Sequence, residues 1–68
     1  MQFQLDNSEY IELNSLLKVT GLCESGGRAK QVIAAGLVTV DGQTEQRKRC
    51  KIRAGQIIEF EGESITVV

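Results

Sequence analysis

SGGRAKQVIAAGLVTVDG, residues 25–42, predicts a helix that is followed directly by a strand and a tight turn. Ser25 is a favoured residue at the start of a helix, and Gly36 is typical of a residue that ends one. Three apolar residues between them share one helical face and should be buried: Ala29, Val32 and Ile33. The stretch therefore predicts an amphipathic helix through about Ala35 that packs on a sheet.

Beyond this helix the apolar period changes from helical to alternating. Val38 and Val40 alternate with their neighbours, and Asp41-Gly42 is a strong hairpin signal that predicts a returning strand over residues 43–45. Residues 57–60 form another apolar strand pattern. Glu61-Gly62 then predicts a second turn, followed by a strand over residues 65–68.

The segment before residue 25 predicts a second, shorter helix. Its leucines and one threonine follow helical spacing up to Gly21: Leu13, Leu16, Leu17 and Thr20. Its N-cap is ambiguous between Glu12 and Asn14, and residues 3–5 and 9–11 are candidates for a first strand. The fold class expected is α+β, with two short helices packed on a small, mainly antiparallel sheet of about four to five short strands.

The length and composition fit one small domain over residues 1–68. Hydrophobic residues make up 41% of the 68, which argues against disorder, and no apolar run reaches membrane-spanning length. Residues 1–10 are polar and acidic, unlike a signal peptide. We therefore expect a cytoplasmic protein with no membrane partner.

The chain lacks the residues that most catalytic and metal sites need. It has no histidine and only two cysteines, so a four-ligand zinc site cannot be assembled from one chain. No Ser or Cys has an activating partner evident in the sequence. We predict that the protein is not an enzyme and has no catalytic residues, no metal, no cofactor and no small-molecule substrate.

Positive charge is concentrated in one seven-residue window, residues 47–53. The window carries +5, so the remaining residues sum to −6 in a chain of net charge −1. Such a cluster is typical of a polyanion-binding surface, because Lys and Arg replace the counterions around phosphates. The cluster consists of Arg47, Lys48, Arg49, Lys51 and Arg53. A charged edge strand that prevents aggregation is the structural alternative.

The conformation of this window decides how its charges are arranged. If residues 47–53 are extended, alternation places four cations on one face, and Cys50 and Ile52 on the other face anchor the segment to the core. If the segment is a loop, the charges still cluster but lose this order. The four cations of the extended alternative are Arg47, Arg49, Lys51 and Arg53.

The start of the second helix is a further candidate anion site. Free backbone N–H groups and the positive end of the helix dipole attract phosphate, and glycines allow a close approach. Glu24 nearby opposes this attraction. The candidate residues are Ser25, Gly26, Gly27, Arg28 and Lys30.

The three aromatic residues, Phe3, Tyr10 and Phe60, are not interleaved with basic residues. Stacking on unpaired bases needs such aromatics. Their placement favours recognition of shape and phosphates over reading of splayed bases. Phe60 lies in an apolar strand and is expected in the core, and Tyr10 is expected to be a packed or rim residue.

Together these segments resemble the alpha-L RNA-binding motif, the domain named for the fourth protein of the small ribosomal subunit. That pattern has two short helices, a second helix that begins with Ser and has Ala four residues on, a G-x-V-x-V-x-G motif, and a final turn before an apolar strand. The matching residues are LNSLL at 13–17, then Ser25, Ala29, Ile33, Gly36, Val38, Val40 and Gly42, and IRAGQII at 52–58. The resemblance covers residues 12–60, and residues 21–56 look like the small stand-alone bacterial members of the family.

The resemblance implies a non-catalytic protein that binds structured RNA, and the class of RNA that it implies is ribosomal RNA. It implies contacts by Ser25, Arg28 and Lys30 of the second helix and by four residues of the basic window: Arg47, Lys48, Arg49 and Lys51. The chain departs from the family at Gly26, where Arg is common, and at Gln56, where Asp often follows Gly. The alternative function is a protein-interaction adaptor that docks its basic strand on an acidic partner.

Overall fold

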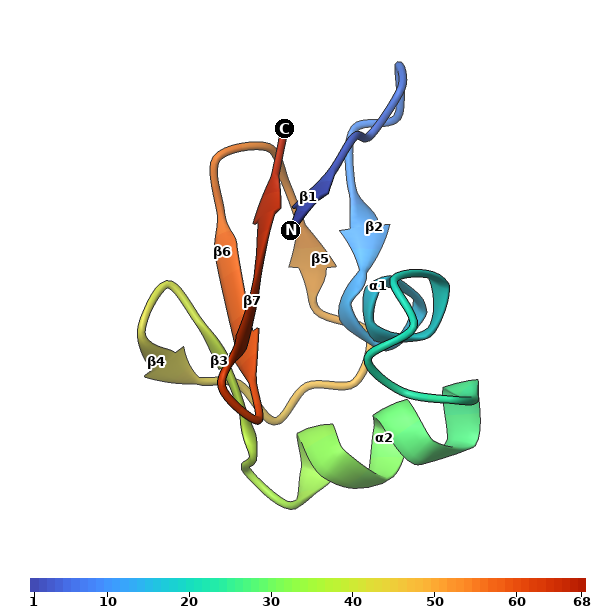
Figure 1. Ribbon diagram of the computed structural model, residues 1–68, viewed down its shortest axis with the longest axis vertical. Coiled ribbons are helices and arrows are strands. Elements are labelled where there is room, and N and C mark those ends of the chain that lie inside the picture. Colours follow the sequence, from blue (N-terminus) through green and yellow to red (C-terminus); the bar gives the residue numbers. More distant parts are fainter.

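The computed structural model describes residues 1–68 and places two helices beside two β-sheets (Figure 1). The helices are α1 (Leu13–Val19) and α2 (Gly26–Ala34). The five-stranded sheet contains β1 (Gln2–Phe3), β3 (Val38–Val40), β4 (Gln43–Thr44), β6 (Ile57–Phe60) and β7 (Glu63–Val67). The two-stranded sheet contains β2 (Ile11–Glu12) and β5 (Lys51–Ile52). The α+β fold class expected from the sequence is confirmed.

The larger sheet has the order β1-β7-β6-β3-β4 and is antiparallel except where β1 pairs parallel with β7. Both predicted hairpin turns are present. Asp41 and Gly42 have φ angles of 52° and 82°, and Glu61 and Gly62 have 51° and 79°. Two successive positive φ values are the mark of type I′ turns, whose twist matches that of the strands they join.

Helix α2 begins and ends as the sequence predicts. The Ser25 hydroxyl accepts a hydrogen bond from the Arg28 backbone N–H at 3.1 Å, and Gly36 follows the helix with φ of 79°. The predicted apolar face is buried, since Ile33 and Ala29 have no exposed surface. This face lies in one cluster of 13 buried residues, to which α1, both sheets and Cys23 also contribute.

Helix α1 starts without a side-chain cap, because the Glu12 side chain at its N-cap makes no capping hydrogen bond. Its first N–H groups are instead satisfied from the basic window. The Leu13 N–H donates to the Cys50 carbonyl at 2.9 Å, and the Asn14 N–H donates to the Lys48 carbonyl at 3.0 Å. The start of α1 therefore holds the backbone of residues 48–50 in place.

The N-terminal strands differ from the expectation. Residues 3–5 and 9–11 do not form one strand of the main sheet, because β1 pairs with β7 while β2 pairs with β5 in a separate ribbon. In Figure 1 this ribbon lies between the larger sheet and α1. Neither helix has the length and apolar composition required to cross a membrane.

Candidate nucleic-acid interface

The basic window, residues 47–53, is a turn followed by a short strand. The Cys50 N–H donates to the Arg47 carbonyl at 3.2 Å, which closes a turn around residues 48 and 49. Only Lys51 and Ile52 are in strand β5. The loop alternative therefore holds for the first half of the window, and the row of four cations on one strand face is not formed.

The window is nevertheless firmly attached to the domain. Ile52 is fully buried in the core, Cys50 is half-buried against it, and the carbonyls of residues 48 and 50 accept hydrogen bonds from α1. All five basic side chains of the window are exposed. An open concavity of about 400 Å³ lies among Arg47, Arg49, Cys50 and Lys51. A polyanion would meet these cations on a rigid backbone.

Arg47 is already paired within the chain. Its Nε and Nη2 donate to the two carboxylate oxygens of Glu45, each at 3.0 Å, and its backbone N–H also donates to Glu45 at 2.9 Å. These hydrogen bonds lower the pKa of Glu45 to about 2, because they stabilise the ionised carboxylate. Arg47 therefore presents less free positive charge than the other four cations.

Lys51 and Arg53 lie against the ring of Tyr10. The Lys51 Nζ is 5.0 Å and the Arg53 Cζ is 5.7 Å from the ring centroid, both within cation–π range. Tyr10 precedes β2 and therefore reaches these cations across the β2–β5 ribbon. The ring adds an aromatic surface to the basic window, which the sequence had not indicated.

The thiol of Cys50 offers no reactive centre in this concavity. Burial raises the pKa of Cys50 most, and Glu45 raises it further, so the thiol stays protonated near neutral pH. The Arg47 Nη2 donates to its sulfur at 3.7 Å. No group of three or more possible metal ligands occurs in the chain.

The side chain of Gln56, which follows Gly55, has a local role in the turn before β6. The Gln56 Oε1 accepts from the Arg53 backbone N–H at 2.8 Å, and its Nε2 donates to Asp41 at 3.3 Å. Asp41 also accepts from the Ile57 N–H at 2.9 Å. Gln56 therefore ties the end of the basic window to the β3–β4 turn.

The second candidate, the start of α2, is a separate location. The Ser25 hydroxyl is used as a helix cap, while the N–H groups of Gly26 and Gly27 make no hydrogen bond within the chain. Gly26 is half-buried, but a Cβ added there would meet no atom within 4 Å, so a side chain at this position would point into open space. Lys30 is half-buried on the same helix.

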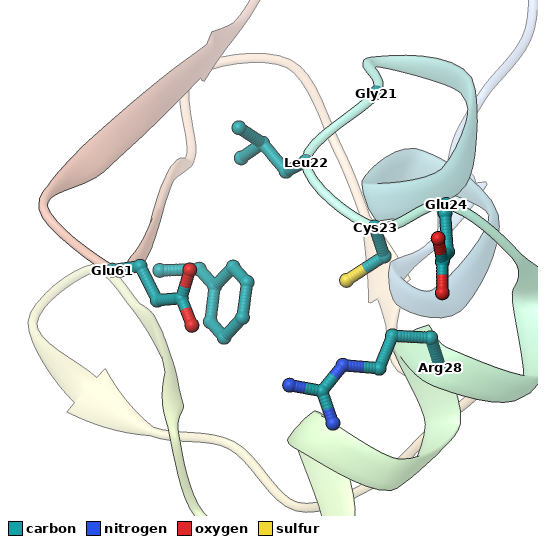
Figure 2. Close-up of a pocket in the computed structure, with 7 residues that line it drawn as sticks. Gly21, Leu22, Cys23, Glu24, Arg28 and Glu61 are labelled. Carbon is teal, nitrogen blue, oxygen red and sulfur yellow. The ribbon is translucent and has the colours of Figure 1, made fainter.

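Arg28 faces a different concavity from the one in the basic window. Figure 2 shows its guanidinium extending from α2 toward Glu61 of the β6–β7 turn, with Cys23 and Glu24 nearby. This space of about 260 Å³ shares no lining residue with the basic concavity. Because it holds one cation and two carboxylates, it does not favour a phosphate. The structure thus brings Arg47, Lys48, Arg49, Lys51 and Arg53 together and leaves Arg28 apart from them.

Sequence reasoning missed two residues of this surface, Glu45 and Tyr10. A signal for Tyr10 was available, since residues 10–12 and 51–53 each place an isoleucine between two polar or amphipathic residues. Two such triplets can pair with both isoleucines facing the core. Because the two triplets are about 40 positions apart, a search for local patterns does not reveal that they pair.

A family model described as S4 domain matches residues 3–68. The YbcJ protein of Escherichia coli (strain K12) is 53% identical over 66 residues, covering 97% of this chain and 94% of that protein. A Bacillus subtilis (strain 168) protein named "Probable ribosome maturation protein RlbA" is 32% identical over 56 residues, covering 82% of this chain and 79% of that protein.

Two solved structures are similar in both fold and sequence. The solution structure of E. coli YbcJ, which has an alpha-L motif involved in RNA binding, matches with a TM-score of 0.77 at 52% identity, covering 98% of this chain and 85% of that chain. The 30S ribosomal protein S4e from Thermoplasma acidophilum matches with a TM-score of 0.71 at 30% identity, covering 85% of this chain and 31% of that chain.

Proposed function

The chain belongs to the S4 domain family and has the alpha-L fold, and on that premise we propose that it is a non-catalytic protein that binds structured RNA. The observation that carries the proposal is the basic window. Five exposed cations stand on a backbone that α1 and the core hold in place. Such an array neutralises phosphates without first having to fold on the RNA.

The four cations other than Arg47 make the main contacts in this proposal. Lys48 and Arg49 project from the turn, and Lys51 and Arg53 from the strand side of the window. Arg47 contributes less, because Glu45 competes with phosphate for its guanidinium. Rigid spacing of cations suits the fixed phosphate positions of a folded RNA.

The start of α2 is a secondary contact in the proposal. The free N–H groups of Gly26 and Gly27 suit one phosphate, with Ser25 and Lys30 beside them. Arg28 contributes least, because Glu24 and Glu61 line the same concavity as its side chain (Figure 2). We therefore expect substitutions at this helix to matter less than substitutions in the basic window.

We propose that the RNA is ribosomal. Support comes from the S4e relative, which is a ribosomal protein, and from the RlbA relative, whose name refers to ribosome maturation. The protein would then meet its partner in the cytoplasm. No cofactor, metal or small-molecule substrate is part of this function.

The test is binding of a structured RNA hairpin and of duplex DNA of matched length across a salt series. We expect a preference for the hairpin and a log–log salt slope of about −2 to −4, at roughly −0.7 to −0.9 per phosphate contact. The double substitution Arg49→Ala/Lys51→Ala should weaken RNA binding and make the slope shallower by about 1.4 to 1.8, the value for two lost phosphate contacts.

The matched control is Lys18→Ala, which removes an exposed cation from the last turn of α1, outside the window. It should leave the salt slope unchanged. Equal and feeble binding to RNA and DNA would overturn the proposal. Capture of an acidic protein that RNA fails to displace would then support the adaptor function instead.

A further inference from the structure

Tyr10 has a position that the stability of the fold does not explain. It is 38% exposed, and it belongs neither to the buried core nor to the half-buried apolar residues packed against that core. Its ring instead contacts Lys51 and Arg53. The one aromatic side chain on this surface therefore lies among the cations of the basic window.

The pairing of β2 with β5 produces this arrangement. Ile11 lies opposite Ile52, and both side chains face the core. Alternation then sends Tyr10 and Arg53 to the opposite, outer face, one step along the same register. Lys51 shares that face and is the diagonal neighbour of Tyr10, close enough for a long side chain to reach the ring.

We infer that Tyr10, Lys51 and Arg53 form a site for one unpaired nucleotide of the bound RNA. The base stacks on the exposed part of the Tyr10 ring, and the two cations bind the phosphates on either side of that nucleotide. This inference rests on the proposed RNA-binding function and extends it from paired, shape-recognised RNA to a looped-out or bulged residue.

The chemistry of the three side chains fits a nucleotide better than it fits phosphate alone. Every nucleobase has a π-face that stacks on an aromatic ring, and a guanidinium plane can stack in the same way. Phosphate contacts need only the cations. The exposed part of the ring is therefore surface that a base can cover and a phosphate cannot use. Because no second aromatic ring lies beside Tyr10, the site offers a stacking surface for only one base.

The test compares two RNAs that carry the same number of phosphates, a hairpin with an unpaired loop and a fully paired blunt duplex. Tyr10→Leu should weaken binding of the hairpin about 5- to 150-fold, the range for loss of one stacked base. Binding of the duplex should change less than twofold, and neither salt slope should change, because no phosphate contact is lost. Tyr10→Phe keeps the ring and should bind both RNAs like the parent.

The matched control is Val19→Ala, which trims another exposed apolar side chain at the far end of α1 from the basic window. It should bind both RNAs like the parent. Thermal melting of each variant establishes that it is folded.

The parent protein provides a second readout that needs no substitution. Tyr10 is the only tyrosine, and the chain has no tryptophan. Its fluorescence lifetime should shorten when the hairpin binds and stay unchanged with the blunt duplex or with inorganic polyphosphate. The lifetime measurement tests whether a base stacks on Tyr10 even if Tyr10→Leu fails to fold.

Two results would overturn the inference. Equal weakening of both RNAs by Tyr10→Leu, with a shallower salt slope, would mean that the ring only holds the two cations in position. Unchanged binding of both RNAs, with an unchanged lifetime, would place Tyr10 outside the interface. Failure of the parent to bind either RNA would instead refute the proposed function itself.

Discussion

Arg47 differs from its basic neighbours because its charge is already compensated inside the chain. Both carboxylate oxygens of Glu45 accept from its guanidinium, and a third hydrogen bond comes from its own backbone N–H. Bidentate pairs of this kind are stronger than point contacts between charges. With its pKa near 2, Glu45 stays ionised at any pH at which RNA binding is measured. Acidification within that range cannot release Arg47.

Substitution of Glu45 should therefore release the Arg47 guanidinium. Glu45→Gln removes the carboxylate and leaves the Arg47 guanidinium free for phosphate, so RNA binding should tighten several-fold. The log–log salt slope should become steeper by about 0.7 to 0.9, the value for one added phosphate contact. A salt series of RNA titrations on parent and variant measures both effects.

The control for this substitution is Glu63→Gln, which makes the same change in net charge at an exposed position of β7. It should leave the slope unchanged. If the two variants behave alike, the gain comes from overall charge, and Glu45 does not restrain Arg47.

At the level of residues, the sequence predicts those features that depend on near neighbours. The Ser25 cap is confirmed by its bond to the Arg28 N–H, and the buried face of α2 follows its helical spacing. Tyr10 escaped prediction because the cations it contacts are about 40 positions away. Glu45 escaped it because the sequence assigns this residue to the returning strand over residues 43–45, whereas β4 ends at Thr44 and the Glu45 carboxylate accepts from Arg47.

At the scale of elements, the turn at residues 48 and 49 has a physical cause in helix α1. The first N–H groups of a helix need acceptors, and the Glu12 side chain supplies none. The carbonyls of Lys48 and Cys50 supply them, which requires the chain to turn instead of continuing as a strand. A contact between segments about 35 positions apart sets this conformation, so local sequence patterns could not predict it.

Helix α2 contains the remaining candidate contact, and Gly26 allows it to be tested. Gly26 does not have a positive φ, and a side chain there would meet open space. Gly26→Arg should therefore fold normally and add a cation at the start of the helix. We expect tighter RNA binding and a slope steeper by about one contact, measured in the same salt series.

Gln31→Arg is the matched control, since it adds the same charge at an exposed position in the middle of α2. It should tighten binding less than Gly26→Arg does. An equal effect of the two substitutions would exclude the helix start from the interface and leave the basic window as the whole of the site.

At the scale of the whole molecule, the charge is unevenly divided between the basic window and the rest. The window carries +5 and the remaining chain −6. Acidic residues such as Glu24 and Glu61 lie around the other concavity, away from the lining of the basic one. An approaching polyanion is drawn to one region and repelled elsewhere, so local field and not net charge orients the encounter.

The unfolded chain keeps the same seven-residue window, so the contribution of the fold to RNA binding can be measured. If folding supplies the interface, RNA binds the native state far better than the unfolded state and stabilises it. At an RNA concentration of 100 times Kd, this linkage contributes about 2.7 kcal/mol. For a domain of this size that corresponds to a rise in Tm of roughly 10–20 °C.

We expect the fold to contribute because three of its contacts arrange the window. Helix α1 holds the turn, Ile52 anchors β5 in the core, and Tyr10, just before β2, lies against Lys51 and Arg53. A peptide of residues 45–55 has all five cations and none of these contacts. It should bind the hairpin at least tenfold more weakly than the protein and with less preference over duplex DNA. If the peptide matches the protein and RNA leaves the Tm unchanged, charge density alone would account for binding, and the folded arrangement of the window would have no part in recognition.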